Sequence, residues 1–90
     1  MVMYMYTLKD AMNIANILSI KFDKFTIEDF LEGINTELEH GTRNMETNVT
    51  NDDLILTSKI ALAHLKEFPN YYNKEYGLSM FEKYLKSKLR

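Results

Sequence analysis

Apolar residues recur every three or four positions through most of the chain, which is the spacing of one face of an α-helix. Such stripes run through residues 8–18, 54–68 and 78–89, and the clearest one consists of Ile27, Phe30, Leu31, Ile34 and Leu38. One proline and three glycines leave few interruptions. The pattern therefore predicts an all-α protein, with residues 1–90 forming a single domain folded as a compact bundle of three to four helices.

Local signals set the expected limits of the first two helices. Thr7 and Thr26 each stand three residues before an aspartate, a variant of the capping box that begins helices. We therefore expect a first helix over Leu8–Ser19 and a second over Ile27–His40, which Gly41 would end.

The third and fourth helices are expected to differ in burial. Thr50 with Asp53 repeats the cap pattern, so a third helix should run from there to Phe68, just before Pro69. It is apolar almost all the way round and should be the most buried helix. A fourth helix, over Leu78–Lys88, should turn its apolar side toward the bundle: Leu78, Phe81, Tyr84, Leu85 and Leu89.

Two apolar segments outside these helices should also pack. Phe22 and Phe25 are expected to fill the core from a connector. The arm Met1–Tyr6 is too short to cross a bilayer and lacks the basic start of a signal peptide. Packing of the arm on its own bundle is the favoured interpretation, and contact with a partner subunit is the alternative.

Composition narrows the classes of function. A formal net charge of −2 lacks the basic excess of general nucleic-acid binders. The absence of cysteine excludes disulfides, thiolate metal sites and cysteine nucleophiles. Hydrophobic and charged contents of 46% and 27% are ordinary for a soluble protein, so we expect no membrane association.

Three motifs crowd the middle of the chain and carry both histidines. They are Glu37-Leu38-Glu39-His40-Gly41, Thr47-Asn48-Val49-Thr50-Asn51-Asp52-Asp53, and Lys59-Ile60-Ala61-Leu62-Ala63-His64-Leu65 with Glu67-Phe68-Pro69 and Tyr71-Tyr72 after it. Over residues 22–72 the chain resembles an uncharacterised-domain family of small helical proteins from bacteria, phages and large DNA viruses. Its members usually have Asp at the position of Asn70. The resemblance implies a shared site of unassigned chemistry, and an intracellular setting in a bacterium, an infected host or a virion.

The histidines and acids of these motifs define a candidate metal site. Glu37 and His40 stand three residues apart on one predicted helix, and His64 and Glu67 stand three apart on the next. Facing each other, the two pairs would supply imidazole and carboxylate ligands for zinc, iron or manganese. By the helical period, Glu37 lies about 80° and His40 about 140° from the centre of the apolar stripe. His40 therefore reaches the interior only if this helix is buried on a second side.

A structural hydrogen-bond network is the favoured interpretation of the same region. Asp53, Thr57 and His64 follow a face of the third helix that should be buried, and buried polar groups need partners. His64 would be held by Glu37, by Thr57 or by backbone of the Thr47–Thr50 loop. The network would comprise Glu37, Thr50, Asp53, Thr57 and His64.

The sequence favours a binding role over catalysis. No nucleophile motif or glycine-rich phosphate loop is present, so we assign no catalytic residue. Tyr71 and Tyr72 offer rings for stacking on a ligand, although aromatics after a helix end more often fill the core. We expect a small accessory or binding protein with a protein partner, encoded by a virus or phage and associated with the virion or interfering with a host. Metal binding is the alternative, and an anion at the helix start near Thr50 is opposed by Asp52 and Asp53.

Overall fold

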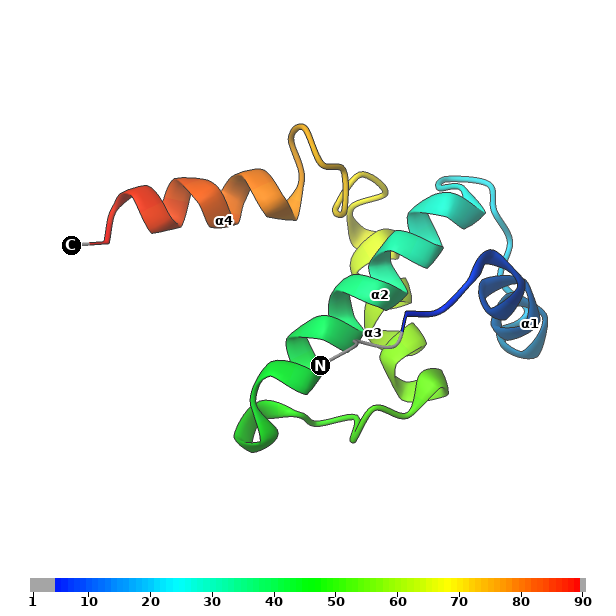
Figure 1. Cartoon of the computed structure of the whole chain (residues 1–90). Helices are drawn as coiled ribbons and strands as arrows, with labels where there is room; N and C mark the ends of the chain where they lie inside the picture. The colour runs from blue at the N-terminus through cyan, green and yellow to red at the C-terminus, as the bar shows by residue number, and fades with distance from the viewer. Residues whose placement is uncertain (1–4, 90) are drawn as a thin grey trace.

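The described part of the chain, residues 5–89 of a computed structural model, is helical. Its helices are α1 (Leu8–Leu18), α2 (Ile27–Arg43), α3 (Leu54–Glu67) and α4 (Leu78–Ser87), with a short 3-10 helix η1 (Met45–Thr47) between α2 and α3. No strand occurs among residues 5–89. The predicted all-α class is confirmed (Figure 1).

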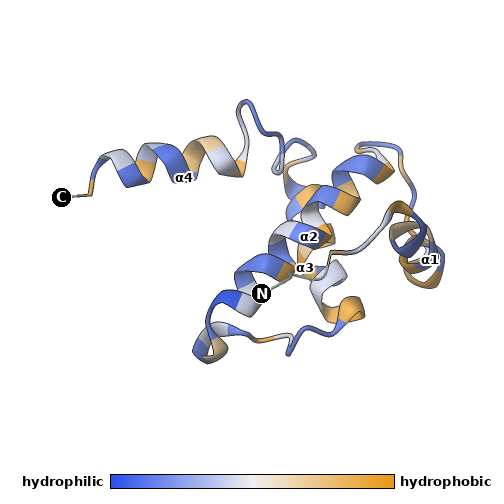
Figure 2. Ribbon diagram, in the orientation of Figure 1, coloured by the Kyte–Doolittle hydropathy of each residue, from blue (hydrophilic) through white to orange (hydrophobic). Residues whose placement is uncertain are grey.

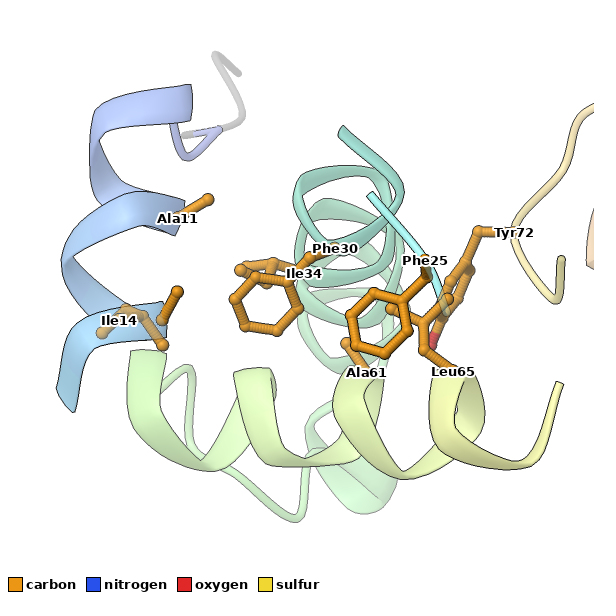
Figure 3. Packing of buried hydrophobic residues seen from close by; sticks show 9 residues of the cluster. Ala11, Ile14, Phe25, Phe30, Ile34, Ala61, Leu65 and Tyr72 are labelled. Atoms are coloured by element: carbon orange, nitrogen blue, oxygen red, sulfur yellow. The ribbon is translucent and has the colours of Figure 1, made fainter. Parts of the chain in front are cut away.

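The core lies between α1, α2 and α3, and α2 is its central helix. α2 packs against both other helices and against η1. Its Phe30 and Ile34 are fully buried and meet Ala61 and Leu65 of α3 (Figure 3). The sequence had indicated α3 as the central, most buried helix; the central place belongs to α2, whereas α3 has four buried residues, as α2 does. Leu56, in the first turn of α3, is half exposed.

The first two helix starts follow the predicted caps, but the end of α2 does not. The Thr7 and Thr26 hydroxyls each accept a hydrogen bond from the backbone of the aspartate three residues on. Gly41 does not end α2, which continues to Arg43. Left-handed backbone, the reason for glycine at a helix end, is not adopted at Gly41. The chain leaves the helix at Asn44, in extended conformation.

The N-cap of α3 lies three residues later in the chain than expected. Asp53 is the N-cap, and its carboxylate accepts a hydrogen bond from the Leu56 amide at 2.9 Å. Thr50 is therefore not the cap; its hydroxyl accepts from the Asp52 amide at 3.2 Å and from the Thr57 hydroxyl at 3.2 Å. The left-handed backbone of Asn51 and Asp52 explains the shift, because it separates Thr50 from the helix.

The two apolar segments outside the helices are attached to the core. Phe25 is buried, and Phe22 packs edge-on against it with ring centroids 5.7 Å apart while remaining partly exposed. At Tyr6 the N-terminal arm forms two hydrogen bonds with the Asn35 amide of α2. This agrees with packing on its own bundle, although the start of the arm, residues 1–4, lies outside the described residues.

α4 extends away from the three-helix body instead of closing it (Figure 1). The sequence predicted an inward apolar side. Leu78 does pack against the core, but the prediction is wrong for the rest: Phe81, Tyr84, Leu85 and Leu89 are 59–75% exposed. The preceding loop sets the direction of α4. The Gly77 amide donates to the Asn73 carbonyl at 2.7 Å, and a Cβ at Gly77 would overlap backbone atoms of Tyr71 and Asn73. Only glycine fits this turn, and α4 leaves the body from it.

Candidate functional site: a carboxylate, tyrosine and histidine cluster

A polar cluster joins α2, α3 and the loop before α4. The Tyr72 hydroxyl donates to Glu37 Oε2 at 2.6 Å. His64 Nδ1 lies 2.9 Å from the same hydroxyl and 3.2 Å from Glu37 Oε2. Because the Tyr72 hydroxyl donates its hydrogen bond to the carboxylate, His64 Nδ1 must be the donor in its contact with that hydroxyl. Three side chains thus share one carboxylate-centred network.

Gly33 makes room for this network. The Tyr72 ring lies directly against α2 at Gly33, where a Cβ would be 2.6 Å from Tyr72 Cε2 and 3.1 Å from Ala61 Cβ. The ring is only 6% exposed and belongs to the hydrophobic core. Its apolar part therefore stabilises the core while its hydroxyl reaches the Glu37 carboxylate.

Tyr71 covers the outer side of the cluster. Its ring stacks on His64 with centroids 4.3 Å apart and an angle of 11° between the planes. The His64 side chain is 35% exposed, so it is half-buried and not buried as the projection of α3 suggested. Tyr72 fills the core, as expected of aromatics after a helix end, and Tyr71 stacks on a residue of the protein itself.

Burial and the adjacent carboxylate shift the tyrosine acidities. Desolvation by burial, followed by the hydrogen bond to Glu37 and the charge of Glu37, raises the pKa of Tyr72 far above its usual value. Burial, then Glu37 and Glu82, also raises the pKa of Tyr71. Both phenols are thus kept protonated, and Tyr72 remains a hydrogen-bond donor throughout the neutral range.

This shift predicts a loss of stability in alkali. The unfolded chain releases the Tyr72 proton as pH rises through about 10, whereas the folded protein retains it. The folded state then binds more protons, so the free energy of unfolding is unaffected below that pH and falls above it. Urea denaturation between pH 8 and 11 should show this decline. Tyr72→Phe should reduce the slope and the exposed Tyr84→Phe should not; equal slopes in both variants would contradict the assignment.

His40 connects the cluster to α4. Its Nδ1 lies 4.0 Å from Glu37 Oε1, and its Nε2 lies 3.7 Å from Glu82 Oε2 on α4. The Glu37 side chain is 11% exposed and that of His40 is 33% exposed. The carboxylate is therefore the more interior of the two, as the helical projection indicated. His40 is positioned between the interior carboxylate and the extended helix.

The three sequence motifs meet beside this cluster. A pocket of about 230 Å³ is lined by Glu37, His40, Gly41, Thr47, Asn48, Val49, Thr50 and Ile60. These residues come from all three motifs on which the resemblance rests. The motifs are thus neighbours in space, and this pocket and the cluster share Glu37.

Comparison with known proteins confirms the resemblance. The model of a family described as a protein of unknown function (DUF5661) matches residues 11–82. The chain belongs to this family. The match is longer than the expected segment 22–72, since it includes most of α1 and the first half of α4. Neither a curated protein nor a solved structure matches the chain.

The DUF5661 segment contains the whole network, but the predicted members of that network are only partly joined. His64 lies against Glu37, one of the three partners that the sequence had left open. Thr57 instead donates to Thr50, and Asp53 caps α3, so these three residues hold the start of α3 separately. The network attaches the Tyr71–Tyr72 segment to the bundle, whereas we had expected it to hold the Thr47–Thr50 loop.

The four proposed metal ligands do not assemble into one set. Glu37 approaches both histidines, whereas Glu67 is exposed near the end of α3. Within residues 5–89, no group of three or more His, Cys, Asp or Glu residues lies together so as to hold a metal ion.

We therefore expect zinc-loaded and chelator-treated protein to unfold at the same temperature, because a ligand that bound only the folded state would raise the midpoint. Differential scanning calorimetry at pH 7.5 measures this. An increase in midpoint with zinc, iron or manganese that is lost in a variant with both histidines replaced by glutamine would restore the metal interpretation.

Sequence reasoning missed three contributors to the site. Tyr72 was assigned to the core or to a ligand but not to Glu37, and Gly33 and Glu82 were not assigned to the site at all. A glycine inside an amphipathic helix was the available signal for Gly33, because such a residue often marks a close approach.

None of the helices described is long and apolar enough to span a membrane.

Proposed function

We propose that the protein is a small binding protein that docks α4 onto another protein surface. The supporting observation is the exposed apolar side of α4, remote from the packed body. Met80, Phe81, Tyr84 and Leu85 are 44–62% exposed. By the 100° helical period they occupy one half of the helix. The other half carries Ser79, Lys83, Lys86 and Ser87, and Figure 2 shows apolar and polar segments alternating along α4.

Such a helix needs a covering surface. An isolated helix of 10 residues is marginal in water. In the described chain the body meets α4 at Leu78 near its start and at Glu82. Contiguous exposed apolar side chains of this kind typically mark a protein contact. An amphipathic helix with anchors at Phe81 and Leu85 suits insertion into an apolar groove.

The polar cluster holds the loop from which α4 begins. Glu37 and His64 hold Tyr72, and the adjacent Tyr71 carbonyl accepts a hydrogen bond from the Leu78 amide at 2.6 Å. His40 adds the contact with Glu82. We infer that the cluster positions the docking helix and has no catalytic role.

On the resemblance alone, we extend the proposal to a virus- or phage-encoded accessory protein that docks on a virion component or a host protein. The partner would present an apolar surface bordered by carboxylates, because lysines flank the apolar stripe of α4.

Photocrosslinking from α4 tests the proposal. A photoreactive phenylalanine analogue is placed at Phe81 on the apolar half, and in a matched control at Lys83 on the polar half. Illumination of the source cells should give a discrete protein adduct from position 81 and none from position 83. Equal labelling from both positions, or none from either, would refute docking through the apolar side.

A further inference from the structure

We propose that the surface covering α4 is a second copy of this chain, paired through two antiparallel α4 helices about a twofold axis. The inference rests on the proposed function and specifies the partner. The observation behind it is that an apolar stripe runs along α4 and that a recess suited to such a stripe lies at the N-terminal end of the same helix.

The recess lies at the N-terminal end of α4. It measures about 230 Å³ and is almost entirely apolar, lined by Phe68, Asn70, Tyr71, Tyr76, Gly77 and Phe81. Phe68 and Tyr76 are more than half exposed there. In an antiparallel pair, the C-terminal half of one helix lies beside the N-terminal half of the other. Leu85 of each copy would then enter the recess of its partner.

Charge complementarity favours the same arrangement. Residues 78–90 contain one acid and four bases, whereas residues 1–77 contain twelve acids and seven bases. Glu67 and Glu75 stand next to the recess residues Phe68 and Tyr76 in the sequence and are exposed. Neither forms an ion pair within residues 5–89.

The lysines near the end of α4 complement these acids. By the helical period Lys88 lies on the same side as the apolar stripe, and its Nζ is 5.2 Å from the centre of the Tyr84 ring, whereas Lys86 lies on the polar half. Neither lysine forms an ion pair in the described chain. In the antiparallel pair Lys88 would approach the Glu67 and Glu75 carboxylates of the other copy.

A second copy of the chain would also keep the apolar stripe of α4 covered at all times. A twofold interface uses the same patch on both subunits, so one contact covers both apolar stripes. It needs no further component and is present wherever the chain is folded. Pairing would give α4 the neighbour that a 10-residue helix requires.

Sedimentation equilibrium of the purified protein tests the pairing. We expect a dimer that dissociates on dilution, and a dissociation constant raised roughly tenfold or more in Leu85→Glu, since burial of one leucine is lost. The matched control Ser79→Glu adds the same charge on the polar half and should leave the constant unchanged. A wild-type protein that is monomeric up to millimolar concentration would overturn the inference.

A charge exchange tests the antiparallel arrangement independently of folding. Lys88→Glu should weaken the dimer, and the control Lys83→Glu on the other side of α4 should not. Mixing Lys88→Glu with a double variant, Glu67→Lys with Glu75→Lys, should restore association as a heterodimer. Absence of restoration would overturn this geometry even if both variants fold.

The two proposals fail in different ways. A monomeric purified protein whose Phe81 position crosslinks to a different protein would overturn self-pairing and leave docking through α4 intact. A monomeric protein without any Phe81 adduct would overturn both. An adduct of twice the chain mass from Phe81, formed with purified protein, supports both.

Discussion

Tyr72→Ala should lower the free energy of unfolding by about 3–5 kcal/mol, the usual cost of removing a large aromatic side chain from a core. The change removes a ring that is 6% exposed and also the donor that faces Glu37 at 2.6 Å. A chain of this size has only about 5–13 kcal/mol of stability, so the variant should be close to unfolding. Urea titration followed by circular dichroism measures the effect.

Two companion variants separate the parts of this effect. Tyr72→Phe keeps the ring and leaves the Glu37 carboxylate without its hydroxyl donor, which should cost about 1–3 kcal/mol. Tyr71→Ala removes a less buried ring and should cost less than Tyr72→Ala. If Tyr72→Ala and Tyr71→Ala were equally stable, the central position of Tyr72 would be wrong.

Gly33→Ala should destabilise the protein by about 1–3 kcal/mol, the typical cost of overpacking. In an exposed helix interior the same substitution would stabilise by about 1 kcal/mol. The sign reverses here because the added Cβ would lie 2.6 Å from the Tyr72 ring and 3.1 Å from Ala61 Cβ. Movement of the ring would also lengthen the hydrogen bond to Glu37.

Gly41→Ala in the same helix is the control. Its Cβ would meet only the side-chain amide of Asn48, at 3.0 Å, and a small rotation of that amide relieves the contact. We expect Gly41→Ala to be neutral or stabilising by thermal denaturation. A Gly33→Ala variant at least as stable as wild type would show that Tyr72 does not lie against α2 at this position.

Much of the three-helix body was predictable from local rules. The caps at Thr7 and Thr26 and the apolar stripe of α2 depend on residues close in the sequence, and these predictions are confirmed. The errors occurred where distant residues decide. The exposed apolar side of α4 depends on the direction imposed by the turn at Gly77, which spacing along α4 does not encode.

The site was predictable only in part for the same reason. Glu37 was one of three partners that the sequence offered for His64, and the two residues lie on facing sides of neighbouring helices. Tyr72 joins them across 35 residues of sequence from Glu37, a distance at which periodicity gives no register. Glu67 has the right residue type and spacing for a ligand, yet it lies near the end of α3 and faces solvent.

Hydrogen–deuterium exchange of the α4 amides tests the central claim most directly, because it reports whether this helix gains its order from docking. For the purified protein, the account predicts that protection of the Phe81–Leu85 amides rises with protein concentration and is lost in Leu85→Glu, while the α2 amides remain protected throughout. Strong protection of the α4 amides at all concentrations in both proteins would contradict the account, because α4 would then be stable without a docking partner.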